Sequence, residues 1–347
     1  FYTFHAISYL VDVYRQKTPP QKNLLRLGLY LALFPKLVMG PIVPYHELEP
    51  ALAQRTIDAQ DVSDGCFRFT IGLAKKALLA DALAGLVTGI WGDLASLTVL
   101  SAWLGLIGYA LQLYFDFSGY SDMAIGLGRM LGFRFPENFR YPYLCSSISD
   151  FWRRWHISLG SWFKEYLYFP LGGSRAGTLR TLRNLLLVWL ATGLWHGASW
   201  NYVLWGLYFG VLICLEKLLT PRFRAHPRKG LLAGLYRPVC LLLAVLGWVL
   251  FRAEDLPAAG RYFACLFGGA AGASAQARLY LHDFWPVLLL GAVGATPLCA
   301  KLAGRLGAKL RPGVRAAVQA VLVLALLACS TVWLLNGSFQ SFVYFQF

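Results

Sequence analysis

The sequence is short of charged residues. Only 14% of its 347 residues are Asp, Glu, Lys or Arg, against roughly 25% in soluble domains, whereas 57% are hydrophobic. Its mean hydropathy is +0.52. This shortage excludes a water-soluble enzyme, a disordered tail and a coiled coil, and it indicates a polytopic membrane protein. At about 20 apolar residues per spanning helix, the chain has room for roughly eight to ten membrane elements and for no separate soluble domain.

Several familiar motifs are also missing. The sequence contains no P-loop, no GxSxG and no HExxH, the usual motifs of ATP-driven transporters, serine hydrolases and zincins, which argues against these three classes. Its seven cysteines lie far apart and form no CxxC pair, which argues against a metal site and against a disulfide framework. We expect most of them to be small apolar fillers of helices.

Acidic residues are few, with 17 Asp and Glu against 32 Lys and Arg, and the net charge is +15. The basic residues lie in loops between apolar runs, so the positive-inside rule explains them better than nucleic-acid binding does. Three loops are rich in basic residues. Arg129–Arg183 holds nine with three acids, Lys217–Arg237 holds six with no acid, and Lys301–Arg315 holds five with no acid. These loops are therefore predicted to be cytoplasmic. Arg252–Asp283 has three charges of each sign and is predicted to lie outside.

Long uncharged runs predict the membrane segments. The clearest run is Leu94–Phe115, followed by Asn184–Leu215 and Ala316–Phe347, of which the first 20 residues can cross a bilayer. Gly65–Trp91 carries charges and is predicted to be an amphipathic or protein-buried helix. The shorter candidates are Leu24–Val43, Pro238–Phe251 and Phe284–Ala300.

The run over residues 184–215 has a distinctive predicted topology. Because both flanking loops are cytoplasmic, it must leave and re-enter that side as a tilted or re-entrant hairpin, with Gly193–Trp200 at the bend. Irregular backbone at membrane depth is tolerated where it is buried or lines a watery cavity. His196, at this bend, is the best candidate for a general base or acid. The alternative is a neutral imidazole hydrogen-bonded to a helix carbonyl.

Residues 149–170 are predicted to form one amphipathic helix in the cytoplasmic interface. His156 lies at the edge of its apolar stripe and is the second candidate, although interfacial histidines without function are common. Arg153 and Arg154 occupy the other face, where they could meet an anionic donor or simply be solvated. The stripe recurs at spacings of three and four residues and consists of Trp152, Trp155, Leu159, Trp162, Tyr166 and Phe169.

Two carboxylates flank a Phe-Ser-Gly-Tyr-Ser segment after the first clear span. Asp116 and Asp122 are predicted either to line the cavity or to cap the next helix, since Asp and Ser favour N-cap positions.

The same regions resemble a known family. The motifs, in order, look like those of a bacterial membrane-bound O-acyltransferase (MBOAT) of the alginate O-acetyltransferase-like branch. The match is dense up to about Gly210 and looser beyond it. Its motifs are FYTFHAISYLVDVYR at the start, LFPKLVMGPIVPY, DFSGYSDMAIGLGRMLGFRFPENFRYPY, SDFWRRWHISLGSWFKEYLYFPLGG, GLWHGASWNYVLWG and the terminal FVYFQF.

The resemblance implies an all-α MBOAT-type helical membrane domain with a central tunnel, in the bacterial inner membrane. It implies an essential His196 and a second catalytic His156, with no permanently bound cofactor and no metal. Acetyl-CoA or another thioester is the implied donor. The implied partners are membrane lipid, an extracytoplasmic O-acetyltransferase and a polysaccharide acceptor. Because relatives carry helices before FYTF and this chain starts at Phe1, we expect N-terminal helices to be missing.

Other functions remain open at this stage. A membrane conduit or transport module would also need a cavity, although we find no internal inverted repeat of the kind that transporters show. Within the enzyme class, the acceptor could be alginate or a similar exopolysaccharide, acetylated cellulose, peptidoglycan or, for D-alanyl transfer, teichoic acid.

Overall fold

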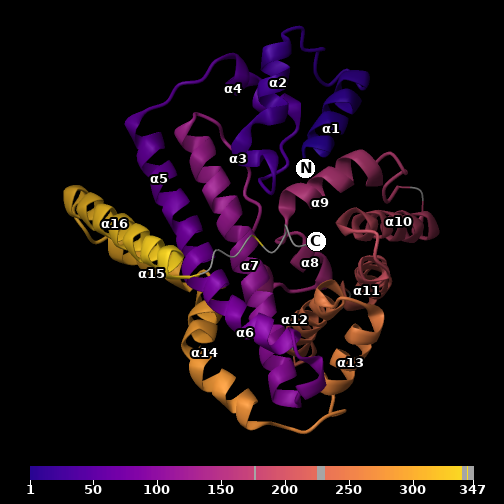
Figure 1. The fold of residues 1–347 in the computed structure, drawn as a ribbon. Coiled ribbons are helices and arrows are strands. Elements are labelled where there is room, and N and C mark those ends of the chain that lie inside the picture. The colour runs from indigo at the N-terminus through magenta and orange to yellow at the C-terminus, as the bar shows by residue number, and fades with distance from the viewer. Residues whose placement is uncertain (176, 225–230, 338–341, 343–347) are drawn as a thin grey trace.

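The computed structural model describes residues 1–175, 177–224, 231–337 and 342, and within these ranges it contains helices and no strand (Figure 1). Side chains at 220–233 lie outside the description, as do parts of the predicted loop 217–237 and of the terminal FVYFQF motif. The helices are α1 Tyr2–Tyr14, α2 Leu24–Ala32, α3 Phe34–Leu37, α4 Tyr45–Ala53, α5 Ala59–Ala74, η1 Lys75–Ala80, α6 Asp81–Trp91, η2 Leu94–Ser96, α7 Val99–Met130, η3 Pro142–Leu144, α8 Ile148–Trp152, α9 Ile157–Phe163, η4 Lys164–Tyr168, α10 Thr178–His196, α11 Trp200–Arg224, α12 Leu231–Arg252, α13 Leu256–Leu266, α14 Ala275–Gly294, α15 Leu298–Gly307 and α16 Pro312–Asn336.

Helix α7 forms the centre of the molecule and packs along α5, η1 and α6 (Figure 1). It starts at a capping box in which Thr98 and Ser101 exchange backbone and side-chain hydrogen bonds, which satisfies orphan N–H groups. Facing glycines then allow close contact: a Cβ on Gly72 would lie 2.5 Å from the carbonyl oxygen of Gly119. The predicted protein-buried helix over 65–91 is therefore α5, a π-helical turn and α6, packed directly on α7.

The prediction that Asp116 and Asp122 could cap a following helix is wrong, because α7 runs without interruption through both residues. Neither carboxylate caps a helix, and neither lines the cavity described below. Asp122 pairs instead with Arg68 and Lys75, with N–O distances of 2.6 Å in each case. Both partners come from the α5–η1 segment. The carboxylates therefore serve the contact between two packed helices, where buried charges require partners.

A second buried ion cluster lies six residues earlier on α7, at Asp116. Lys76 Nζ is 2.7 Å from carboxylate oxygens of both Asp81 and Asp116, and all three side chains are less than 10% exposed. Charged residues on η1 and α6 thus face protein, which explains why this segment does not have the composition of a spanning helix.

Helices α10 and α11 form an antiparallel pair that turns at residues 197–199. Small residues allow the close approach, since a Cβ on Gly193 or Gly206 would lie 2.4 Å from the carbonyl oxygen of Tyr202 or Trp189, respectively. The bend of this pair carries His196.

Replacing Gly206 with alanine is expected to destabilise the protein. The new methyl group would overlap the Trp189 carbonyl, and overpacking of this kind costs roughly 1–3 kcal/mol. Thermal unfolding in detergent should show a lower Tm for Gly206→Ala. Gly304→Ala is the matched control, because nothing lies within 4 Å of the position of its Cβ. Equal melting of wild type and Gly206→Ala would show that the helix pair does not depend on this contact.

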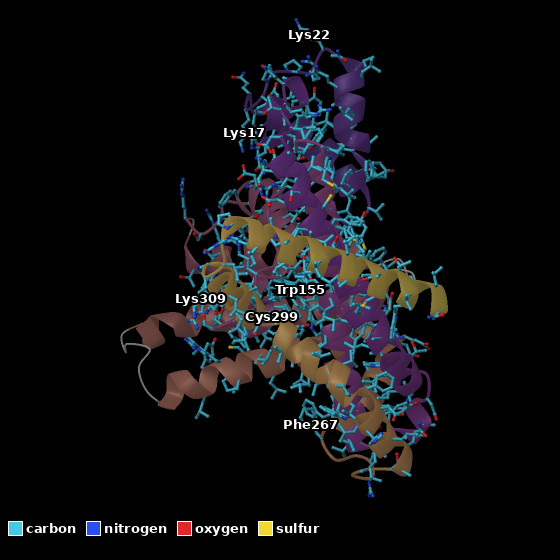
Figure 2. All side chains as sticks on the ribbon, turned by 90° about the vertical axis from the view of Figure 1, so that its left-hand side faces the viewer. Lys17, Lys22, Trp155, Phe267, Cys299 and Lys309 are labelled. Carbon is cyan, nitrogen blue, oxygen red and sulfur yellow. The ribbon has the colours of Figure 1, made fainter. Side chains whose placement is uncertain are left out.

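Four described helices are long and apolar enough to cross a membrane, namely Val99–Met130, Trp200–Leu219, Gly234–Arg252 and Pro312–Asn336. The bent pair α14–α15 would make a fifth span. This is fewer than the eight to ten that length alone allows, because α5–α6 and α10 carry charges. Figure 2 places Trp155 between the end marked by Lys17 and Lys22 and the opposite end marked by Phe267.

Candidate functional site

The segment over residues 149–170 is two short helices joined by a turn, so the prediction of one continuous amphipathic helix is wrong. Helix α8 ends at Trp152, and α9 begins after His156, whose backbone is left-handed at φ 46° and ψ 54°. A left-handed conformation is costly for a residue with a Cβ and must be held by its surroundings.

Asn138, from the loop after α7, holds that turn. Its Oδ1 accepts hydrogen bonds from the Ser158 N–H at 3.2 Å and the Ser158 hydroxyl at 3.0 Å, and lies 3.2 Å from His156 Nδ1. Its carbonyl oxygen accepts from the Ile157 N–H, while the Arg140 N–H donates to the Arg154 carbonyl. These contacts with a distant segment replace the helical hydrogen bonds that would have continued α8 into α9.

His156 is therefore fixed in position and buried, with 3% of its surface exposed. Its ring stacks on Phe1 and meets Phe117 edge to face, with centroid distances of 5.9 and 4.7 Å. Nδ1 lies beside Asn138, and the covered Nε2 has no hydrogen-bond partner within the described residues.

His196 is the last residue of α10 and is half-buried. Aromatic rings surround it, because Trp205, Phe251 and Trp195 have centroids 5.0, 5.1 and 4.7 Å from its own. Trp205 comes from α11 and Phe251 from α12. The helix hairpin and the neighbouring α12 thus enclose the imidazole in an apolar environment.

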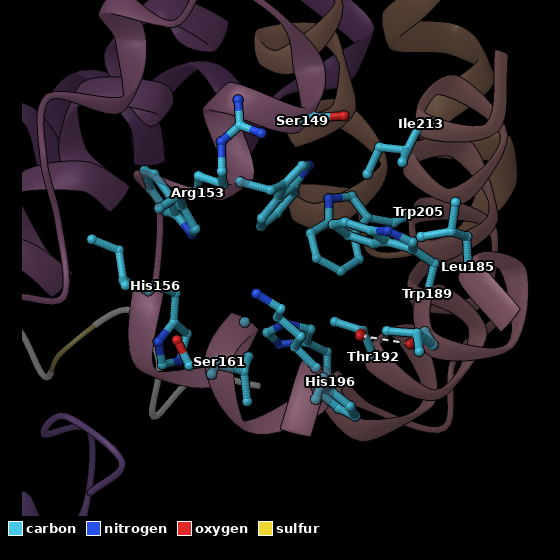
Figure 3. A pocket seen from close by; sticks show the side chains of 18 of the residues that line it. Ser149, Arg153, His156, Ser161, Leu185, Trp189, Thr192, His196, Trp205 and Ile213 are labelled. Carbon is cyan, nitrogen blue, oxygen red and sulfur yellow. Dashed lines mark hydrogen bonds between the residues drawn. The ribbon is translucent and has the colours of Figure 1, made fainter. Parts of the chain in front are cut away.

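Both histidines line one cavity of about 450 Å³, here called the central cavity. Figure 3 shows His156 across the cavity from Trp189 and Trp205, with His196 between the two sides. Its wall is mostly apolar and includes Leu113, Phe117, Trp152, Trp155, Leu159, Phe163, Leu185, Val188, Ile213 and Trp248, which come from helices α7 to α12 and from the α8–α9 turn. The two predicted catalytic residues, 40 positions apart in the chain, therefore meet at one site.

The two arginines are placed differently. Arg153 lines the central cavity, is 70% exposed, and points its guanidinium away from the two histidines in Figure 3. Arg154 does not line it and donates from Nε to Asp150 Oδ2 at 3.0 Å. Partial burial would raise the pKa of Asp150, but the Ser146 N–H and the Arg154 guanidinium outweigh it and hold the pKa below its usual value.

An apolar cavity with two imidazoles can support proton transfer and can exclude water from a reaction. A neutral imidazole can take a proton from a hydroxyl group and pass it to a leaving group. The apolar wall keeps water from competing with that hydroxyl for an activated acyl group. The arrangement suits transfer of an acyl group between two bound molecules.

The composition, the spanning helices and the site define an all-helical, multi-pass membrane protein. The chain belongs to the membrane-bound O-acyltransferase family, whose family model matches residues 11–246.

Its curated relatives are bacterial acyltransferases. A probable alginate O-acetylase, AlgI, of Pseudomonas fluorescens is 47% identical over 271 residues, covering 77% of this chain and 53% of the relative. The peptidoglycan O-acetyltransferase of Helicobacter pylori is 37% identical, covering 75% and 54%. The teichoic acid D-alanyltransferase of Bacillus subtilis is 29% identical, covering 61% and 56%. The chain spans about half the length of these relatives.

Sequence reasoning missed Asn138 as the residue that positions His156. It also missed the aromatic enclosure of His196, to which Trp205 and Phe251 contribute. A single polar residue in a loop carries no periodic signal. Its role depends on hydrogen bonds to residues 18 and 20 positions later, which only the folded chain brings close.

Proposed function

We propose that this chain carries the acyl-transfer centre of a membrane O-acyltransferase. The enzyme moves an acetyl or other acyl group from a cytoplasmic thioester, such as acetyl-CoA, to a hydroxyl group of an extracytoplasmic polysaccharide. The single observation that carries the proposal is the meeting of His156 and His196 at one apolar cavity. The inner membrane of a bacterium is the proposed location.

In the proposed reaction, His196 removes the proton from the acceptor hydroxyl as its oxygen attacks the thioester carbonyl carbon. The C–O ester bond forms, the C–S bond breaks, and the departing thiolate receives the proton from the imidazolium. His156 orients the donor or stabilises the negative charge that develops on the carbonyl oxygen. The donor is a substrate, and the scheme requires no permanently bound cofactor.

Alginate or a similar exopolysaccharide is the proposed acceptor, because identity to the probable alginate O-acetylase exceeds that to the peptidoglycan and teichoic acid enzymes. An extracytoplasmic O-acetyltransferase that completes delivery to the polymer is the proposed protein partner. Membrane lipid surrounds the spanning helices.

Deleting the gene tests this proposal. Exopolysaccharide and peptidoglycan from the deletion strain and from the complemented strain would be hydrolysed in mild base, and the released acetate would be quantified. We expect the exopolysaccharide of the deletion strain to lose its acetate and that of the complemented strain to regain it. Peptidoglycan acetate should be the same in both strains. A change confined to peptidoglycan would reassign the acceptor, and unchanged acetate in both polymers would contradict O-acetylation.

A further inference from the structure

A second cavity lies next to the central one. It measures about 340 Å³ and is here called the polar cavity. The two cavities share Ile157, Ser161 and Lys164, which lie along one face of α9 and η4, so they adjoin across this helix. Lys17, near the end of the molecule in Figure 2, also lines the polar cavity. Neither of the two predicted catalytic histidines lines it.

A different histidine faces this cavity. His46, at the start of α4, lines it, and Nδ1 of its ring is 2.9 Å from Oδ2 of Asp12 on α1. Asp12 has no exposed side-chain surface, and its Oδ2 also accepts a hydrogen bond of 2.8 Å from the Tyr166 hydroxyl. Burial of a carboxylate costs free energy of folding, so a buried carboxylate needs hydrogen-bond partners. Here its contact with Nδ1 orients the imidazole of His46.

The orientation determines what His46 can bind. An ionised carboxylate only accepts hydrogen bonds, so Nδ1 of a neutral His46 carries the hydrogen and Nε2 keeps its lone pair. Nε2 has no hydrogen-bond partner among the residues that the structure describes, and 37% of the side chain is exposed. The ring therefore presents a hydrogen-bond acceptor to the cavity. By contrast, the carboxylate beside His282, that of Asp283, is exposed.

The charges of the wall favour a neutral ligand. Two lysines and two glutamates line the cavity, so their formal charges cancel. Lys17 is paired with Glu165 at 2.5 Å, and Lys164 lies over the ring of Phe169 at 5.5 Å. A phosphate would need cations that are not already engaged. A hydroxyl group needs only an acceptor such as Nε2 and neighbouring polar atoms such as the Ser161 hydroxyl.

We propose that the polar cavity is a second ligand site, in which His46, oriented by Asp12, accepts a hydrogen bond from a hydroxyl group of a neutral ligand. Two kinds of molecule could supply such a hydroxyl group: a sugar ring and the pantetheine arm of a thioester. The site is defined by its own geometry and does not depend on acyl transfer at His196.

Equilibrium binding to the nanodisc-reconstituted protein tests the site. The probes are S-methyl pantetheine and methyl α-mannoside at millimolar concentrations, each compared with its fully O-methylated form, in which no hydroxyl hydrogen remains. We expect one probe to bind and its O-methylated form to bind about tenfold more weakly, consistent with the loss of one hydrogen bond. The probe that binds identifies the source. Binding of neither probe, or equal binding of the O-methylated forms, would overturn the proposal.

Variants provide the second measurement. His46→Phe and Asp12→Asn should each weaken binding of the preferred probe about tenfold, because the first replaces the imidazole with a ring that cannot accept a hydrogen bond and the second removes the carboxylate that orients it. His282→Phe is the matched control, since His282 lies 3.0 Å from an exposed carboxylate and does not line the polar cavity. Thermal unfolding identifies variants that fail to fold. Wild-type affinity in a folded His46→Phe protein would refute the assignment.

Discussion

Replacing His196 with glutamine should lower acyl transfer by about 10²- to 10⁴-fold, the usual contribution of a general base. Glutamine is close in size and still forms hydrogen bonds, but it cannot take up a proton at neutral pH. Because the imidazole lies among the rings of Trp205 and Phe251, an uncharged replacement should be tolerated by the fold. The measurement is thioester consumption coupled to polymer acetylation, normalised to the amount of protein in the membrane.

The control is His282→Gln, which removes an exposed histidine outside the central cavity and should retain full activity. Equal polymer acetylation by wild type and His196→Gln would contradict base catalysis. It would favour the alternative of a membrane conduit, in which the cavity lets a molecule pass and His196 has a structural role.

Replacing Asn138 with alanine should have the second-largest effect. Its Oδ1 contacts the Ser158 N–H, the Ser158 hydroxyl and His156 Nδ1, so its loss would release the left-handed turn that positions His156. Misplacement of a catalytic group by about 1 Å can cost 10²-fold. We expect kcat to fall about 10- to 100-fold with a smaller change in KM, because Asn138 does not line the central cavity.

Asn138→Asp separates positioning from general damage. Aspartate retains an acceptor oxygen at the same place, and the Ser121 hydroxyl, 3.2 Å from Asn138 Nδ2, can rotate to donate to it. Because Asn138 is fully buried and a carboxylate there is costly, this variant should recover part of the activity that Asn138→Ala loses. An Asn138→Ala protein with unchanged kcat would show that the turn does not need this side chain.

Much of the architecture could be predicted from local composition. Most of the uncharged run over residues 94–115 lies in α7, which begins at Val99, and the run over 316–347 overlaps α16, a candidate span. The bend of the run over 184–215 corresponds to the α10–α11 turn at His196. Such features are readable because each depends on a continuous stretch of residues or on a few neighbouring glycines.

The predictions that proved wrong concern features that depend on contacts between segments distant in the chain. Gly119 and the serines around Asp116 and Asp122 resemble turn residues, yet α7 continues because Gly119 allows α5 to approach and Arg68 and Lys75 neutralise Asp122. In the segment over 149–170, the aromatic periodicity is helical throughout. The helix nevertheless breaks before His156, because Asn138 and Arg140 supply competing hydrogen bonds.

The sequence alone therefore determined the class of the protein: its shortage of charge, its apolar runs and its ordered motifs require a helical membrane protein and single out His156 and His196. Only the tertiary structure decided how these residues are arranged relative to one another. Their shared cavity, the turn held by Asn138 and the pairing of His46 with Asp12 all join segments distant in the chain. Hydrophobicity and periodicity are local properties, whereas the geometry of hydrogen bonds and ion pairs exists only after distant helices have packed.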